Sequence, residues 1–459
     1  MKITAAIESV LTDLVDILWG LPLVILLVGG GFFFLIYSRL RPYRHIGEGI
    51  RLLTRPAARD DPGQLSHFQA LSTALSGTLG MGNVSGVAIA IAVGGPGAIF
   101  WMWMSAFLGV ATKFYTCTLA VMFRGQDSEG VWQGGPMYVI REGMSRRWLP
   151  LAYFFAVAGL FGTLPSFQAN QLTQVLRDII AIPMGLASEE NHFTFDLSMG
   201  IFFSALVIIV GLGELQRLGK VARILVPSMV AGYFVLTVFV LLTHISDVPE
   251  ALALIFSDAF TGNAMLGGAV YAVIRTGVQR AAFSNEAGIG TEAMAHGAAK
   301  TNEPVREGLV AMLGPIIDTL IVCTCTALII LISGVWKSGD INGATLTAHA
   351  FGVLFPYGGS VILALLVSVL SLSTMFTFWY YGSKCLGFLI GAKYQHHYLW
   401  FYCTLLIISA LVSLNMVINL IDSAYALMAI PTMTSTLLLA PKVNQAAKQY
   451  FAKRAQNLS

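Results

Sequence analysis

Long apolar stretches recur along the whole chain, and they limit what it can fold into more than any other feature. A helix of about 20 mostly apolar residues spans the hydrocarbon core of a bilayer, which is about 30 Å thick. Such stretches occur eleven times among the 459 residues, which predicts an all-α integral membrane protein with about 11 transmembrane helices. The predicted spans are 17–38, 67–93, 97–123, 149–181, 197–213, 223–244, 264–299, 307–334, 357–390, 398–415 and 418–440.

The composition agrees with a lipid environment. Hydrophobic residues make up 56% of the chain and charged residues 11%, whereas about 25% of an ordinary soluble chain is charged. Too few polar residues are present to cover a soluble core, so the lipid bilayer is the expected partner. The net charge is only +3, and the basic residues are spread over several short loops. We therefore do not expect nucleic acid as a partner.

Lysine and arginine are distributed unequally between alternate loops. Most of them lie in the loop at 39–59, in the loops near 124, 146, 220 and 300, and in the tail from Lys442, whereas the other set of loops carries only Lys2 and Lys337. Short cytoplasmic loops carry the excess of basic residues, so the N-terminus is predicted to lie outside and the C-terminus in the cytoplasm. No small-residue cleavage site follows the first apolar stretch, and we expect that stretch to be a true span.

Glycines interrupt two of the predicted spans. The pattern S-x-x-x-G-x-G occurs at 76–82 in the second span and again at 284–290 in the seventh, 208 residues later. Each break lies in the first span of a five-span unit, where transporters built from inverted repeats place their discontinuous helices. We therefore predict a single transporter domain, 1–459. Its predicted parts are an extra N-terminal helix (17–38), a first five-helix repeat (67–244), a second five-helix repeat (264–440) and a tail (441–459).

The glycines could serve only close helix packing, but the polar residues inside the breaks favour a binding site. Polar side chains at membrane depth are costly unless they line a cavity or find partners, and an unwound backbone exposes N–H and C=O groups. A bound zwitterion and a cation would satisfy both. The N–H groups after Gly80 would face a carboxylate, and the carbonyls before it would face an ammonium or Na⁺. The polar residues concerned are Ser76, Thr78, Asn83, Ser284, Asn285 and Glu286.

Three runs of residues resemble the alanine or glycine:cation symporter family, within the amino acid–polyamine–organocation superfamily. They are 74–78 (ALSGT), 94–103 (GGPGAIFWMW) and 283–290 (FSNEAGIG). The resemblance extends over nearly the whole chain. It implies a core of two inverted five-helix repeats behind one extra N-terminal helix, in the inner (plasma) membrane of a bacterium. It also implies symport of a small neutral amino acid, such as alanine or glycine, with Na⁺ or H⁺ and without any other cofactor.

The same resemblance implies particular site residues. The backbone carbonyls of Ser76 and Leu79 and the hydroxyls of Ser373 and Thr374 correspond to the ligands of one Na⁺. The positions that correspond to the substrate site are Thr78, Gly80, Gly82, Asn83, Phe167, Gln168, Phe283, Ser284, Asn285 and Trp379. One position departs from the family pattern, because Thr116 stands where related chains tend to carry an acid three residues after Lys113. That departure puts the ion pair of the family in doubt here.

Several of these residues have a simpler interpretation. Ser373 and Thr374 could hydrogen-bond to the preceding helical turn instead of an ion, and Trp379 could be a packing residue or an interfacial anchor. Ionisable groups inside a membrane mark function by default. Among them, Lys113 is expected to replace a cation or to pair with a carboxylate. The other intramembrane ionisable groups are Glu286, Glu292 and Asp318.

Other classes of protein fit the sequence less well. A different secondary carrier, proton-coupled or an exchanger, is the nearest alternative. A membrane enzyme is disfavoured because the sequence offers no convincing metal site. Cys323 and Cys325 are two positions apart, so on a helix their thiols would point to nearly opposite faces and could not bind one metal. A channel filter would need a ring of subunits or four internal repeats, whereas the chain shows two halves.

Overall fold

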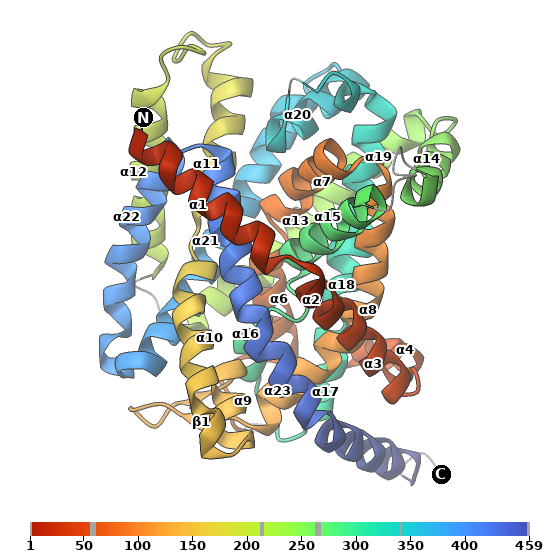
Figure 1. Cartoon of the computed structure of the whole chain (residues 1–459), viewed down its shortest axis with the longest axis vertical. Helices are drawn as coiled ribbons and strands as arrows, with labels where there is room; N and C mark the ends of the chain where they lie inside the picture. The colour runs from red at the N-terminus through yellow and green to blue at the C-terminus, as the bar shows by residue number, and fades with distance from the viewer. Residues whose placement is uncertain (1, 56–60, 212–214, 262–267, 340, 457–459) are drawn as a thin grey trace.

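Nearly all of the described chain is helical. The computed structural model describes residues 2–55, 61–211, 215–261, 268–339 and 341–456. Within these ranges the strands are β1 (Gly125–Gln126) and β2 (Trp132–Gln133), which form one antiparallel hairpin. The hairpin lies at one end of the molecule and α20 (Gly343–Leu354) at the other, and we call these the hairpin end and the α20 end (Figure 1). The C-terminus lies at the hairpin end, whereas the chain starts toward the α20 end.

Helices of membrane-spanning length confirm that this is an all-helical integral membrane protein. Across the described ranges, seven helices are long and apolar enough to cross a bilayer, or up to nine if each of two bent pairs is one span. Some are single helices, and others combine shorter helices end to end. The single ones are α8 (Gly97–Met122), α12 (Phe193–Gly211), α13 (Leu215–Thr243), α21 (Gly359–Ile390) and α23 (Leu414–Gln456).

The N-terminal span begins later than predicted. The chain starts with α1 (Lys2–Leu18) and bends by 52° before the helix that covers the predicted span 17–38. Pro22 stands in the first turn of that helix, where a missing N–H costs nothing. The helix consists of α2 (Leu21–Val24), η1 (Ile25–Gly29) and α3 (Gly30–Tyr37), and the short helices α4 (Arg41–Arg44) and α5 (Ile46–Leu53) follow.

The predicted span 149–181 is confirmed as a candidate membrane span, at 146–181, but its helix is interrupted. The chain leaves the helical conformation after Gly162 and resumes it at Ser166, on either side of Pro165. Proline lacks an N–H and disfavours a helical residue before it, which explains the interruption. The elements of this region are α9 (Pro136–Gly143), η3 (Arg146–Trp148), α10 (Leu149–Gly162), α11 (Ser166–Leu176) and η4 (Arg177–Ala181).

The C-terminal region also differs from the prediction. The span 418–440 and the tail 441–459 were predicted as separate parts, but α23 runs through both as one helix of 43 residues. The residues after Pro441 are rich in Ala, Lys and Gln, which are good helix formers. The elements η7 (Ala392–His397) and α22 (Tyr398–Leu411) precede α23.

The middle of the second half contains a run of short helices. The start of the predicted span 264–299 falls on residues outside the described ranges. The observed elements are α14 (Val248–Thr261), α15 (Gly268–Asn285), α16 (Glu292–Gly297), α17 (Pro304–Ala311), α18 (Leu313–Pro315), η5 (Ile316–Cys323), α19 (Thr324–Ser333) and η6 (Val335–Lys337).

The two glycine-broken helices occupy the centre of the molecule. The first consists of α6 (His67–Thr78), η2 (Gly82–Gly86) and α7 (Val87–Gly94), and every residue from 70 to 91 is buried. The second consists of α15 and α16. By contrast, the most apolar windows of α12 and α13 are only 28% buried. The core therefore holds the polar, glycine-rich segments, and the apolar helices face outward.

Candidate functional site

The first break is short and is capped by a side chain that follows it. The helix α6 ends at Thr78, leaves the helical conformation at Leu79, and resumes beyond Gly80 with a bend of 52°. The N–H of Gly80 donates to Asn83 Oδ1 at 3.2 Å. A Cβ on Gly80 would lie 2.4 Å from Thr374 Oγ1, so only glycine fits. The break therefore places bare backbone against the ninth predicted span.

Three of the four predicted ion ligands, Ser76, Ser373 and Thr374, lie together between α6 and α21. Thr374 Oγ1 donates to the carbonyl of Ser76 at 3.0 Å, and Ser76 Oγ donates to the carbonyl of Ser373 at 3.0 Å. The hydroxyls of Ser373 and Thr374 also donate to the carbonyl of Leu370, in the preceding turn of α21, at 2.8 Å and 3.2 Å. Thr377, which the sequence analysis did not single out, donates to Ser76 Oγ at 3.0 Å. Thr377 could have been identified from the sequence, because it lies one helical turn beyond Ser373.

The two broken helices touch one another at their glycines. A Cβ on Gly82 would lie 3.3 Å from Ser284 Cα and 3.4 Å from the carbonyl oxygen of Phe283. Any larger residue at Gly82 would push the second broken helix away. The glycines of the first break therefore serve close approach, and what approaches is the polar segment of the other break.

A buried carboxylate joins the two breaks. Asp318, in η5, accepts from Asn83 Nδ2 at 2.6 Å and from Ser284 Oγ at 2.6 Å. Asn285 Nδ2 donates to Thr319 Oγ1 at 3.0 Å. All of these residues are buried. The sequence marked Asp318 as an intramembrane acid but did not place it between Asn83 and Ser284.

The second break is longer and contains an acid in an unusual conformation. Glu286 has a positive φ of 56°, and Gly288 and Gly290 follow with φ of 84° and 99°. A non-glycine residue with positive φ is uncommon, so its surroundings must hold it there. The carboxylate of Glu286 accepts from Tyr425 OH at 3.0 Å and from the hydroxyl of Thr291. Side-chain bonds therefore fix this break.

Lys113 lies inside the bundle. It is buried on α8, against Gly314 of α18. Among the described residues, no ion pair joins it to Glu286, Glu292 or Asp318. Thr116, which replaces an acid of the family pattern, donates to Glu292 Oε1 at 3.3 Å. The position keeps a contact with the second broken helix, although it carries no charge.

Aromatic rings surround the junction on one side. The ring of Phe283 packs edge-on against Phe167, with 4.7 Å between centroids, and lies 5.7 Å from the ring of Tyr425. A Cβ on Gly86 would be 3.7 Å from the Phe283 ring. Phe283 thus covers the first broken helix directly.

Trp379 lies elsewhere. It packs against Gly211 and lines a cavity of about 290 Å³ with Tyr380, Lys384 and His396. In the described part of the chain, no ring contact joins Trp379 to Phe283 or Phe167.

Three predicted site residues have buried polar atoms without a hydrogen-bond partner in the described structure, which is rare in folded proteins. These atoms are Thr78 Oγ1, Gln168 Oε1 and Trp379 Nε1.

At the α20 end, α20 seals the first broken helix. Thr347 Oγ1 donates to the carbonyl of Val84 in η2 at 3.0 Å. Gln171 Oε1 accepts from the backbone N–H of Ala344 at 2.9 Å and from Ser85 Oγ at 2.6 Å. These bonds tie α20 and α11 to the segment just beyond the break, and none of them was predicted.

At the hairpin end, backbone bonds pin the start of the first broken helix to the end of the second. Lys300 N–H donates to the carbonyl of Leu65 at 2.6 Å. The guanidinium of Arg124 donates to the carbonyls of Gly297 at 2.7 Å and Pro62 at 2.9 Å. Burial lowers the pKa of Arg124 to about 10, so it stays charged at neutral pH.

A cluster of two histidines and one glutamate reinforces the same end. Glu307 on α17 accepts from His67 Nδ1 at 2.5 Å and from His296 Nδ1 at 2.6 Å. His67 begins α6 and His296 belongs to α16, so three elements meet at one carboxylate. All three side chains are buried. Separating α6 from α16 would require breaking this cluster.

The fold of the chain matches that of a solved protein structure. The structure matches the crystal structure of MhsT in complex with L-phenylalanine with a TM-score of 0.59 at 13% sequence identity, covering 84% of this chain and 98% of that chain. The match establishes the fold of this chain.

The chain belongs to the sodium:alanine symporter family, whose model matches residues 4–459. It is 35% identical to the sodium/alanine symporter AgcS of Methanococcus maripaludis, over 96% of this chain and 97% of that protein. It is 32% identical to the probable sodium/glutamine symporter GlnT of Bacillus subtilis, over 96% of this chain and 90% of that protein. The prediction of a membrane transporter rather than an enzyme is therefore confirmed.

Proposed function

We propose that this protein is a secondary active symporter that couples the entry of Na⁺ to the uptake of a small neutral amino acid, such as alanine or glycine. The observation that carries the proposal is the meeting of the two broken helices, where Asn83 and Ser284 share the carboxylate of Asp318. The proposed architecture is eleven spans, with two inverted five-helix repeats behind one N-terminal helix. A polar junction at the centre of such repeats is where substrates and ions bind in transporters of this kind.

The proposed Na⁺ ligands are the carbonyls of Ser76 and Leu79 and the hydroxyls of Ser373 and Thr374. Oxygen ligands suit a hard cation, and Thr374 Oγ1 already lies 3.0 Å from the carbonyl of Ser76. A cation would replace the hydrogen bonds that now join α6 to α21. Thr377 is within reach of the same group through Ser76 Oγ.

The amino acid would bind at the first break. Its carboxylate would take the N–H groups near Gly80, which requires Asn83 Oδ1 to release the Gly80 N–H that it now accepts from. The unpartnered Thr78 Oγ1 and Gln168 Oε1 support a polar ligand there. Phe283 and Phe167 would limit the size of the side chain. The full proposed set is Thr78, Gly80, Gly82, Asn83, Phe167, Gln168, Phe283, Ser284 and Asn285. Trp379 is left out of this set because it lines a different cavity.

The two seals account for alternating access. Opening the α20 end breaks the bond from Thr347 to Val84, and opening the hairpin end breaks the bonds of Arg124 and the cluster at Glu307. Each seal holds a part of the first broken helix. The ion and the substrate, bound beside that helix, can therefore bias which end opens.

The proposed orientation places the hairpin end in the cytoplasm of a bacterial cell, with the N-terminus outside. Arg44→Cys and Lys453→Cys would test it in intact cells, since all five native cysteines are buried. An impermeant maleimide should label neither position until the membrane is made permeable. Labelling of either one from outside overturns this orientation.

A proton-coupled carrier is the second candidate, and the buried cluster of His67, His296 and Glu307 is the observation that favours it. Histidine is the side chain that most readily gains and loses a proton near neutral pH. A proton bound there would act on the seal of the hairpin end rather than on the central junction.

Uptake of labelled alanine into liposomes tests both candidates when Na⁺ and pH gradients are imposed separately. One Na⁺ that moves down a tenfold gradient and 100 mV supplies about 3.7 kcal/mol, enough to accumulate alanine several hundredfold. Accumulation with a Na⁺ gradient alone supports the symporter, and accumulation that needs a pH gradient favours the proton-coupled carrier. Labelled glutamine in the same vesicles tests the substrate named for GlnT. Uptake of neither amino acid above that of empty vesicles overturns the proposal.

A further inference from the structure

A basic cavity lies at the hairpin end, away from the two broken helices. It has a volume of about 470 Å³, within the range of small-molecule sites, about 300–1,000 Å³. Three elements that are far apart in the sequence form it: α5 with the residues after it, the start of α17, and the last turns of α23. The charged residues that line it are Glu48, Arg51, Arg55, Glu303, Arg306, Lys453 and Arg454.

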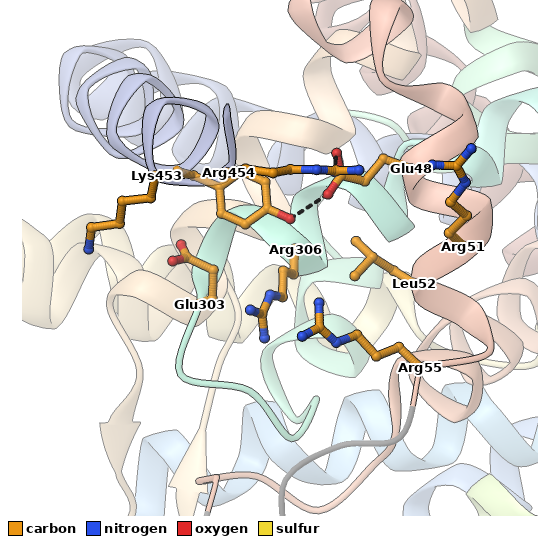
Figure 2. A pocket seen from close by; sticks show the side chains of 9 residues that line it. Glu48, Arg51, Leu52, Arg55, Glu303, Arg306, Lys453 and Arg454 are labelled. Atoms are coloured by element: carbon orange, nitrogen blue, oxygen red, sulfur yellow. Dashed lines mark hydrogen bonds and ion pairs between the residues drawn. The ribbon is translucent and has the colours of Figure 1, made fainter. Parts of the chain in front are cut away.

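Part of this charge is already balanced. Glu48 forms an ion pair with Arg454 and accepts a hydrogen bond from Tyr450 OH at 2.6 Å. Figure 2 shows Glu48 and Arg454 in the upper part of the view. Of the remaining charges, Glu303 is the one acid against four basic side chains. In the described ranges, none of those four belongs to an ion pair.

Two guanidinium groups face the same space. Figure 2 shows the side chains of Arg55 and Arg306 below the pair of Glu48 and Arg454, and both residues line the cavity. Arg306 Nε is buried and has no partner among the described residues, and a buried polar group without a partner is costly. Like charges also repel at close range. An anion between the two groups would remove both penalties, and planar guanidinium groups bind phosphate oxygens in pairs.

The cavity also lies where the protein meets the lipid surface. The helix α5 follows shortly after the first span and is amphipathic, with Gly49 and Leu52 buried and Ile50 54% exposed. Basic residues beside an exposed apolar one are typical of a helix that lies in the membrane interface. Gly49 holds α5 against α17, because a Cβ there would be 2.3 Å from the carbonyl oxygen of Leu309.

We propose that this cavity binds a phosphate group, as the headgroup of an anionic phospholipid or as free phosphate, through Arg55 and Arg306. The bound phosphate links α5, α17 and α23. Arg306 precedes Glu307, the acceptor of the histidine cluster that seals the hairpin end. Phosphate binding therefore stabilises the closed form of that end. The effect on transport rests on the proposed symport, but the binding itself does not.

Thermal unfolding of the full-length protein tests the binding without any transport assay. The protein is placed in nanodiscs of phosphatidylcholine alone, in nanodiscs that also contain phosphatidylglycerol, and in phosphatidylcholine nanodiscs with inorganic phosphate added. Stabilisation by phosphatidylglycerol identifies a lipid headgroup, and stabilisation by inorganic phosphate identifies a soluble ligand. Equal melting temperatures in all three samples overturn the proposal.

Substitutions then locate the site. Arg55→Gln and Arg306→Gln should each raise the phosphatidylglycerol or phosphate concentration needed for half-maximal stabilisation about tenfold, since each removes a charge-assisted hydrogen bond. Arg306→Lys keeps the charge without the paired donors and should fall between wild type and Arg306→Gln. Arg44→Gln is the matched control, because Arg44 belongs to the same basic segment but does not line the cavity. If Arg44→Gln loses as much stabilisation as Arg306→Gln, the effect is general surface charge and the site is refuted.

Discussion

The two breaks share a glycine pattern but are built differently. The first contains no ionisable side chain, and the carboxamide of Asn83 caps it three residues after Gly80. The second contains Glu286 at a positive φ, two glycines at positive φ, and then Glu292. Side chains from other helices hold it, among them Tyr425 on α23.

This difference separates two roles. The first break depends on glycines. Because Gly80 and Gly82 have no side chain, Thr374 and Phe283 can reach the backbone there. It can therefore offer main-chain atoms to an ion and a carboxylate. The second break depends on side chains that are present, because Tyr425 and Thr291 hold the carboxylate of Glu286. We expect substitutions that add atoms to be worst at the first break, and substitutions that remove polar atoms to act at the second.

Gly80→Ala should have the largest effect. The added Cβ would lie 2.4 Å from Thr374 Oγ1, so α6 and α21 must move apart and the proposed ion site is lost. Overpacking of about 1–3 kcal/mol corresponds to roughly a 5- to 150-fold loss of alanine uptake. Gly47→Ala is the control, because a Cβ at Gly47 meets nothing within 4 Å. Uptake by Gly80→Ala at the wild-type level, with equal expression, would show that the close contact is dispensable.

Thr374→Ala should come next. Losing one oxygen ligand is expected to raise the Na⁺ concentration for half-maximal uptake about tenfold, with little change in expression. Thr374→Ser keeps the hydroxyl and should resemble wild type. Ser368→Ala serves as the control on the same helix, since Ser368 only bonds to the preceding turn. Unchanged Na⁺ dependence in Thr374→Ala would remove this hydroxyl from the ion site.

The sequence could predict the breaks because their signal is local. Glycines and polar residues within a few positions of one another mark both, and helices indeed end at Thr78 and Asn285. The resemblance to a family placed Ser373 and Thr374 with Ser76, although almost 300 residues separate them. Neither the local pattern nor the family resemblance could place Asp318 beside Asn83, 235 residues away. That contact depends on how η5 packs between the breaks.

Other features were missed because the sequence does not distinguish them. The interruption before Pro165 lies in an apolar run that reads as one span, and the helical tail of α23 reads as a separate polar segment. Several bonds of the seals depend on backbone acceptors, such as the carbonyls that bind Arg124. A carbonyl is present at every residue, so no residue pattern could have indicated them.

Phe283→Ala should have a smaller and more selective effect. Removing the ring enlarges the space beside Gly82 and Gly86, so unlabelled leucine should begin to compete with labelled alanine. In the wild type we expect glycine to bind about 1 kcal/mol more weakly than alanine and leucine not to compete. Trp379→Ala tests the other predicted aromatic and should change selectivity less, because Trp379 lines a different cavity. Phe161→Ala, an exposed ring on α10, is the control. Leucine competition in the wild type would refute the small pocket.

Tyr425→Phe should have the smallest effect and isolates the second break. It removes the hydroxyl that donates to Glu286 Oε1 at 3.0 Å but keeps the ring that packs on Phe283. The carboxylate then relies on Thr291, so we expect a loss of about 0.5–1.5 kcal/mol of stability and a melting temperature lower by a few degrees. Tyr381→Phe is the matched control, because the buried Tyr381 hydroxyl has no partner in the described structure and its removal should be neutral or stabilising. Equal melting temperatures for the two variants would show that the bond from Tyr425 does not hold Glu286 in its left-handed conformation.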